Sequence, residues 1–332
     1  MKIVRYSIVL LLFSSQLAAK EPDKTAADTT TKTVFQVLQI QSYEDNFVGY
    51  TFDSDDKPFI DFTFSARANI YPFDYLMKIV PKAYRQDLHL NYAFTARLGQ
   101  YIGTRYSSPV IEKRFNPCLF LEYRPKGSYR NTCIQLSYGH ESNGQTLSDS
   151  ISFFKTSEFT HNNVDETIDN ISRGWDYWGA NITADFFMRD NERFSFEGGA
   201  AVRYYLDNGI LQQGKEEYKS WESAWSGAAY TRNQVNGLAA SFTCFIDPCF
   251  VNRIGIVYET GITAPFHNST IKLLARFMLG DFPMVFTYRY GYNGDLAQYG
   301  KLNNTIGIAV ILSSFLKPTD KRKTKNRQPK GK

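Results

Sequence analysis

A histidine and a serine lie two residues apart near the end of one predicted strand, in the run YGHESNG at 138–144. Alternate residues of a strand point to the same side, so His140 and Ser142 share one face. The remaining side chains on that face are apolar or aromatic: Ile134, Leu136 and Tyr138. A serine hydroxyl becomes a strong nucleophile when a base removes its proton. The pair is therefore a candidate base and nucleophile that open toward apolar surroundings.

Such a pair needs a third group that holds the imidazole in the correct tautomer. The next predicted strand carries Asp176 on a mostly apolar face, together with Gly174, Trp178, Ala180, Ile182 and Phe186. Directly opposed side chains of neighbouring strands lie about 5 Å apart. Asp176 is therefore expected to reach His140 if the strand register places them opposite each other.

Alternation of apolar and polar residues dominates the chain. Twelve segments are predicted as strands: 46–53, 58–70, 88–101, 115–124, 132–142, 172–189, 193–205, 235–245, 251–263, 268–280, 282–294 and 303–316. Their second face is more polar than the inner face of a β-sandwich, although sequence alone does not wholly separate the two folds. Aromatic residues make up 16% of the chain, which is typical of the girdles of membrane barrels. We expect an all-β fold, a twelve-stranded antiparallel transmembrane β-barrel.

Both ends of the chain differ from this barrel region. Residues 1–19 have the basic start, apolar run and small residues of a secretory signal peptide. Residues 20–45 are expected to form a periplasmic segment, 46–316 the barrel, and 317–332 a basic disordered tail. The tail holds eight basic residues in a chain of net charge +5. Its composition favours a solvated end, so no nucleic-acid partner is predicted.

The interior and the cysteines allow further predictions. Inward-facing arginines are expected to form a salt-bridged interior with Glu197 and Glu259, and they are Arg67, Arg97, Arg203, Arg253, Arg276 and Arg289. Disulfides Cys118–Cys133 and Cys244–Cys249 are plausible in an exported chain. Four unpaired cysteines are an equally good interpretation.

The motif at residues 140–144 and the run SRGWD at 172–176 resemble the active-site segments of outer-membrane phospholipase A. The similarity extends from about Tyr43 to Leu316 and includes Ser107-Ser108-Pro109, the pattern Pro117-x-Leu119-Phe120-Leu121, the pattern Gly291-Tyr292-x-x-x-Leu296-x-x-Tyr299, and the closing strand from Ile306. That family is a group of twelve-stranded outer-membrane barrels that hydrolyse phospholipid acyl esters. The resemblance therefore implies a multi-pass barrel of the bacterial outer membrane that acts on phospholipids.

The resemblance also implies a role for individual residues. His140 would be the general base, Ser142 the nucleophile and Asp176 the orienting residue, with the backbone N–H of Gly144 at the oxyanion. The family binds calcium at the interface of a reversible homodimer. The matching positions are the carbonyl of Gln145 and the hydroxyl of Ser172, with Ser107 from the partner subunit. This chain departs from the family by having Asp176 where asparagine is usual, and by a longer loop at 146–171.

Two other functions fit parts of the pattern. A lipid A deacylase also has a His-x-Ser-Asn run on an outward barrel face, but those barrels have eight strands. A non-catalytic barrel or pore would leave the His140–Ser142 pair inert, because a lone His-x-Ser is usually a structural accident.

Overall fold

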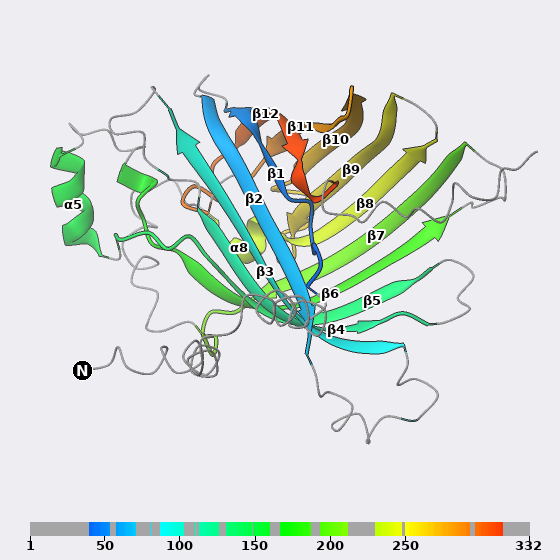
Figure 1. The fold of residues 1–332 in the computed structure, drawn as a ribbon. Helices are drawn as coiled ribbons and strands as arrows, with labels where there is room; N and C mark the ends of the chain where they lie inside the picture. Colours follow the sequence, from blue (N-terminus) through cyan, green and yellow to red (C-terminus); the bar gives the residue numbers. More distant parts are fainter. Residues whose placement is uncertain are drawn as a thin grey trace, which may run out of the picture. The chain divides into compact units, whose positions relative to one another are not determined.

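The computed structural model describes one closed barrel (Figure 1). The described residues are 40–53, 58–70, 81, 87–102, 110, 113–125, 131–147, 149–159, 167–186, 193–211, 230–247, 250–292 and 296–314. Ser107, Cys249, the predicted signal peptide and the basic tail lie outside these ranges. Within them, every strand pairs antiparallel with its neighbours in sequence, and β1 pairs with β12 to close the ring. The predicted fold class is confirmed.

The twelve strands match the predicted segments to within a few residues. They are Phe47–Phe52 (β1), Pro58–Asn69 (β2), Leu88–Tyr101 (β3), Arg114–Tyr123 (β4), Cys133–Ser142 (β5), Gly174–Phe186 (β6), Phe194–Tyr205 (β7), Gly237–Ile246 (β8), Val251–Gly261 (β9), Thr270–Leu279 (β10), Phe282–Gly291 (β11) and Asn303–Ile311 (β12). The last strand ends at Ile311 because its partner β1 begins at Phe47, directly opposite. A 3₁₀ turn, Leu312–Ser314, follows.

The outside of the barrel is apolar on all sides. Each strand exposes at least one large apolar or aromatic side chain: Tyr50, Phe64, Tyr92, Leu119, Leu136, Trp178, Val202, Phe242, Ile256, Leu273, Phe286 and Ile308 are examples in strand order. An exterior of this kind is suited to contact with lipid acyl chains. No helix in the described part of the chain has the length and apolar character needed to cross a membrane.

The inside of the barrel is filled with paired charges. Arg67 contacts Glu122 at 3.0 Å, and Arg97 contacts Asp61 at 2.6 Å. These pairs confirm a salt-bridged interior. The acidic partners of these two arginines differ from those predicted, whereas the predicted Glu259 pairs with Lys272 at 2.6 Å. Strand parity identifies inward charges, whereas the pairing depends on which inward side chains of nearby strands meet.

The segment before β1 takes part in this interior. Tyr43 stacks on the inward ring of Phe120, with 5.2 Å between ring centroids. Asp45 pairs with Arg276, and Gln41 forms a two-way backbone bridge with Arg67. Tyr43 and Asp45, in the segment that the sequence assigns to the periplasm, therefore contact inward-facing side chains of the barrel.

Of the two interpretations of Cys118 and Cys133, the structure shows unpaired cysteines and not a disulfide. Both cysteines are free and buried, and Cys244 is also free. The β4–β5 register pairs Cys118 with Gly139, which is six positions along the strand from Cys133. At about 3.3 Å per residue, this offset is far beyond the reach of a disulfide.

Two short helices lie in the loops at the rim where β5 ends. The helix α5, Ser150–Phe159, lies between β5 and β6, and α8, Arg232–Val235, precedes β8. Asp149 accepts hydrogen bonds from the N–H and hydroxyl of Ser152, so it caps α5. These hydrogen bonds hold the pKa of the Asp149 carboxyl below its usual range.

Candidate active site

The register of β5 and β6 places His140 directly opposite Asp176. His140 Nδ1 lies 2.6 Å from Asp176 Oδ1. An ionised carboxylate can only accept a hydrogen bond, so Nδ1 carries the proton of the neutral ring. The second ring nitrogen, Nε2, is then free to accept a proton. The contact expected from the sequence is therefore present, with the tautomer that a general base needs.

Ser142 and the imidazole meet above a glycine. Ser142 pairs with Gly174 in the same register. A Cβ placed on Gly174 would lie 3.4 Å from His140 Nε2 and 3.4 Å from Ser142 Cβ. The described residues show no hydrogen bond between the Ser142 hydroxyl and Nε2, and such bonds are often long or absent in catalytic sites without substrate. Gly174 thus leaves the space in which the base and the nucleophile approach each other.

This trio lies on the outer surface of the barrel. The neighbouring side chains of the same parity point outward, and Leu136 and Trp178 are 56% and 58% exposed. The His140 side chain is 20% exposed, whereas that of Asp176 is fully covered. The charged member of the trio is therefore shielded, while the base and the nucleophile remain accessible from the lipid side.

The carboxylate of Asp176 has donors on both oxygens. Its Oδ1 faces His140, and its Oδ2 accepts hydrogen bonds from the Tyr138 hydroxyl at 2.6 Å and from the Leu211 N–H at 2.6 Å. Neither Tyr138 nor Leu211 was predicted from the sequence to belong to the site. Parity places Tyr138 on the correct face, but nothing in the sequence links Leu211 to β6.

The turn after β5 is held by Asn143, which is fully buried. Its side-chain amide donates to the Ile171 carbonyl at 2.7 Å, and its Oδ1 accepts from the Arg173 N–H at 2.9 Å. The turn then passes through Gly144 at a positive φ of 58°. The Gly144 N–H makes no hydrogen bond to another described residue, so it can donate to an oxyanion. The Asn-Gly pair is therefore more than a turn signal, because Asn143 joins the two active-site segments.

The candidate calcium ligands Gln145 and Ser172 lie on adjoining chain segments. The Leu147 N–H donates to the Asn170 carbonyl at 3.0 Å, and the Ser172 N–H donates to the Leu147 carbonyl at 2.7 Å. The described residues contain no group of three or more His, Cys, Asp or Glu side chains that could hold a metal ion. The expected donors are instead neutral oxygens, which fit a weakly held Ca²⁺ that keeps several waters. The third, Ser107, lies outside the described residues.

The inward side of the same two strands carries a buried ion cluster. Glu141, between His140 and Ser142, is 1% exposed and contacts Arg232 at 2.7 Å and Arg114 at 3.5 Å. The Arg232 guanidinium also stacks against aromatic rings, those of Trp175, Tyr205 and Tyr299. This cluster pairs the buried Glu141 carboxylate with two arginines. The sequence indicated that Glu141 faces inward but could not identify a partner ninety-one residues away.

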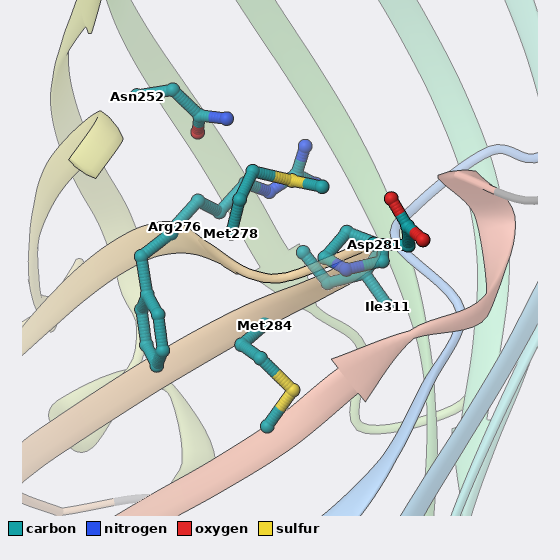
Figure 2. A pocket seen from close by; sticks show the side chains of 8 residues that line it. Asn252, Arg276, Met278, Asp281, Met284 and Ile311 are labelled. Atoms are coloured by element: carbon teal, nitrogen blue, oxygen red, sulfur yellow. The ribbon is translucent and has the colours of Figure 1, made fainter. Parts of the chain in front are cut away.

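A cavity of about 220 Å³ lies at the opposite end of the barrel, near the β10–β11 turn (Figure 2). Its lining combines methionine, phenylalanine and proline with a few polar groups: Asn252, Arg276, Phe277, Met278, Asp281, Pro283, Met284 and Ile311. The lining has an arginine and a carboxylate but neither a histidine nor a serine. The cavity therefore lacks the base and nucleophile that the outer rim of β5 and β6 brings together.

No family model matches the sequence, and no curated protein matches it. Among solved structures, outer membrane phospholipase A from Escherichia coli aligns with a TM-score of 0.55 and 13% identity, covering 82% of this chain and 98% of that chain. An active-site mutant of that protein aligns with a TM-score of 0.55 and 14% identity, covering 82% and 91%. The Salmonella typhi outer membrane phospholipase dimer with bound calcium has a TM-score of 0.55 and 13% identity, covering 82% and 92%.

At 13–14% identity, this likeness shows the fold. The closed ring of twelve strands and its apolar exterior agree with it. The chain is therefore a bacterial outer-membrane β-barrel that is similar in fold to outer membrane phospholipase A.

Proposed function

We propose that this protein hydrolyses the acyl ester bonds of phospholipids at the outer rim of the barrel, with phospholipase A1/A2 and lysophospholipase activity. The observation that carries the proposal is the 2.6 Å contact between His140 Nδ1 and Asp176 Oδ1 on the lipid-facing surface. The free ring nitrogen of His140 and the side chain of Ser142 border the same glycine. The base and the nucleophile are thus accessible from the lipid side, where phospholipids carry their acyl esters, while the orienting carboxylate lies covered beside them.

In the first half of the reaction, Ser142 Oγ attacks the ester carbonyl carbon while its proton moves to His140 Nε2. Asp176 stabilises the imidazolium that results. The bond between the carbonyl carbon and the glycerol oxygen then breaks, and Nε2 returns the proton to that oxygen. A lysophospholipid leaves, and the acyl chain stays on Ser142.

In the second half, a water attacks the acyl-serine carbonyl and gives a proton to His140 Nε2. The fatty acid leaves as the proton returns to Ser142 Oγ. Both tetrahedral intermediates place negative charge on the former carbonyl oxygen, and a preorganised N–H stabilises that charge. The Gly144 N–H, two residues from the nucleophile and without a partner among the described residues, fits this role.

We also propose that calcium and a second subunit complete the site. Gln145 would offer its backbone carbonyl and Ser172 its hydroxyl, with Ser107 from the partner subunit. Bound calcium would supply positive charge near the developing oxyanion. In support, the Salmonella typhi protein of similar fold is a dimer with bound calcium.

The two rival functions are less well supported. Lipid A deacylases of this type are expected to have eight strands, and this barrel has twelve. A pore requires a free lumen, whereas the described interior contains ion pairs, including Arg67–Glu122, Arg97–Asp61 and Arg232–Glu141. These observations favour the phospholipase.

The decisive experiment is hydrolysis of phosphatidylcholine in mixed micelles by the purified protein with Ca²⁺. We expect fatty acid release that falls by about three orders of magnitude or more in Ser142→Ala, and that an excess of chelator abolishes. Ser137→Ala is the matched control, because Ser137 lies on the inward parity of the same strand. Full activity of Ser142→Ala would exclude the proposed nucleophile. Activity that resists the chelator would exclude the calcium site but not the triad.

A further inference from the structure

The segment that follows β7, residues 206–211, folds back over the outside of β6. We call it the strap. The Leu206 N–H donates to the Asp176 carbonyl at 2.8 Å, and the Leu211 N–H donates to Asp176 Oδ2 at 2.6 Å. The strap therefore touches both the backbone and the side chain of Asp176.

Tyr138 joins the strap to the carboxylate. Its hydroxyl donates to Asp176 Oδ2 at 2.6 Å and accepts a hydrogen bond from the Ile210 N–H at 3.0 Å. Its ring packs edge-on against Trp178, with 4.8 Å between ring centroids. One hydroxyl thus serves as donor to the carboxylate and as acceptor for the strap, and the ring contact holds its orientation.

The strap can sit this close because residue 209 is glycine. A Cβ on Gly209 would collide with the side chain of Asp176. The strap and the carboxylate are therefore in direct contact, which accounts for the complete burial of the Asp176 side chain on an otherwise exposed face.

The strap also presents apolar side chains at the barrel exterior. Ile210 is 82% exposed and Leu211 is 47% exposed. Apolar side chains gain free energy by leaving water for lipid. Contact with acyl chains would therefore hold the strap against β6.

We propose that Tyr138 and the strap form a clamp that positions the Asp176 carboxylate against His140, so that Tyr138 is a positioning residue of the proposed reaction. The effect of the clamp on catalysis rests on the proposed function, whereas its geometry does not. It also explains an aspartate at this position. Three donors surround the carboxylate, and an asparagine would turn its NH₂ group toward one of them, most directly toward the Leu211 N–H, which would lose its acceptor.

The first test reads the geometry without any substrate. The chain has four histidines, so ¹⁵N-histidine NMR of the folded barrel in detergent is simple, and His140→Gln assigns the signal of interest. We expect a slowly exchanging Nδ1 proton on His140 that exchanges faster with water in Gly209→Ala and in Tyr138→Phe. Asn208→Ala, one residue earlier at an exposed strap position, should leave it unchanged. Absence of the slow proton, or equal exchange in all variants, would overturn the clamp.

The second test reads the consequence for catalysis. Tyr138→Phe should lower kcat about tenfold, the loss of one hydrogen bond to a charged group, with KM within about twofold of the unsubstituted protein. Tyr50→Phe, at an exposed outward tyrosine of β1, should change neither. In the Asp176→Asn background, Tyr138→Phe should add little, because both act on the same carboxylate.

Fully additive losses in this double variant would overturn the positioning role of Tyr138. If the protein released no fatty acid but the NMR results held, the proposed function would fail and the clamp would stand. If activity were present and kcat unchanged in Tyr138→Phe, the clamp would fail and the proposed function would stand.

Discussion

The outward and inward sides of β5 and β6 differ in what surrounds each polar side chain. On the outside, His140 and Ser142 are partly exposed and border the space above Gly174. On the inside, Glu141 is almost fully buried between two arginines. Of these three consecutive residues, His140 and Ser142 present accessible reactive groups, and Glu141 between them carries a buried, ion-paired charge. In this barrel, strand parity therefore separates the reactive groups from the ion pairs that stabilise the fold.

The charge of the outer site lies where it is covered, as on the inner side. A buried or lipid-facing charge is costly unless it is paired and hydrogen-bonded. Asp176 faces outward, yet it is covered by the strap and has donors on both oxygens. The Asp176 carboxylate is therefore buried and hydrogen-bonded, as Glu141 is on the inner side. The groups that stay exposed in the outer site are an imidazole and a hydroxyl, which can both be neutral.

The largest expected effect is on the outward side. His140→Gln should lower kcat by about 10³-fold or more, and combining it with Ser142→Ala should add almost nothing, because base and nucleophile act as a unit. The free energy of unfolding, measured by urea titration in lipid vesicles, should stay unchanged in both variants. If His140→Gln or Ser142→Ala also lowered the free energy of unfolding, the separation of reactive and stabilising sides would be contradicted.

The next largest effect is expected on the inward side. Glu141→Gln leaves the buried Arg232 without its carboxylate and should lower the free energy of unfolding by about 3 kcal/mol or more. The activity of the folded fraction should stay close to that of the unsubstituted protein. Adding Arg232→Met should recover much of the stability, because the uncompensated charge is removed. If Arg232→Met did not recover any of the unfolding free energy that Glu141→Gln removes, the unpaired Arg232 charge would not be the cause of that loss.

Much of this architecture could be predicted from the sequence because alternation of residue types is a local property. All twelve strands, and the outward parity of His140, Ser142 and Asp176, follow from period-two patterns. The direct opposition of His140 and Asp176 was expected only on condition of the register. That register depends on where the 143–173 connection ends, which the Asn143 side chain fixes.

The remaining parts could not be predicted because they join residues that are distant in sequence. Arg232 reaches Glu141 from a short helix, and Leu211 reaches Asp176 from the strap. The choice between a Cys118–Cys133 disulfide and unpaired cysteines stayed open for a related reason. Equal distance from a turn suggests pairing, but the actual register offsets the two cysteines by six residues. Contacts of this kind depend on the path of the loops and on the strand register, which a local residue pattern does not determine.

A smaller effect on activity is expected from filling the space above Gly174. Gly174→Ala would place a methyl group 3.3 Å from His140 Cε1 and 3.4 Å from Ser142 Cβ, tighter than most side-chain contacts. A displacement of about 1 Å between reacting groups can cost about 10²-fold in rate. We expect kcat to fall by up to that factor with little change in unfolding. Gly255→Ala, where the nearest atom would be 3.5 Å away, is the matched control in a strand without the triad.

The smallest expected effect returns to the inward side. The Tyr177 hydroxyl donates to Asn116 Oδ1 at 2.7 Å, and Arg203 stacks on the same ring at 4.4 Å. Tyr177→Phe removes the hydrogen bond but keeps the ring, so unfolding should become easier by about 1 kcal/mol. Tyr204→Phe, at the exposed neighbour of Tyr205, should have no measurable effect on unfolding. Activity should be unchanged in both variants, because neither hydroxyl contacts the triad.

A drop in kcat with Tyr177→Phe but not with Tyr204→Phe would show that the inward side also positions the reacting groups. Strand parity would then not separate chemistry from stability.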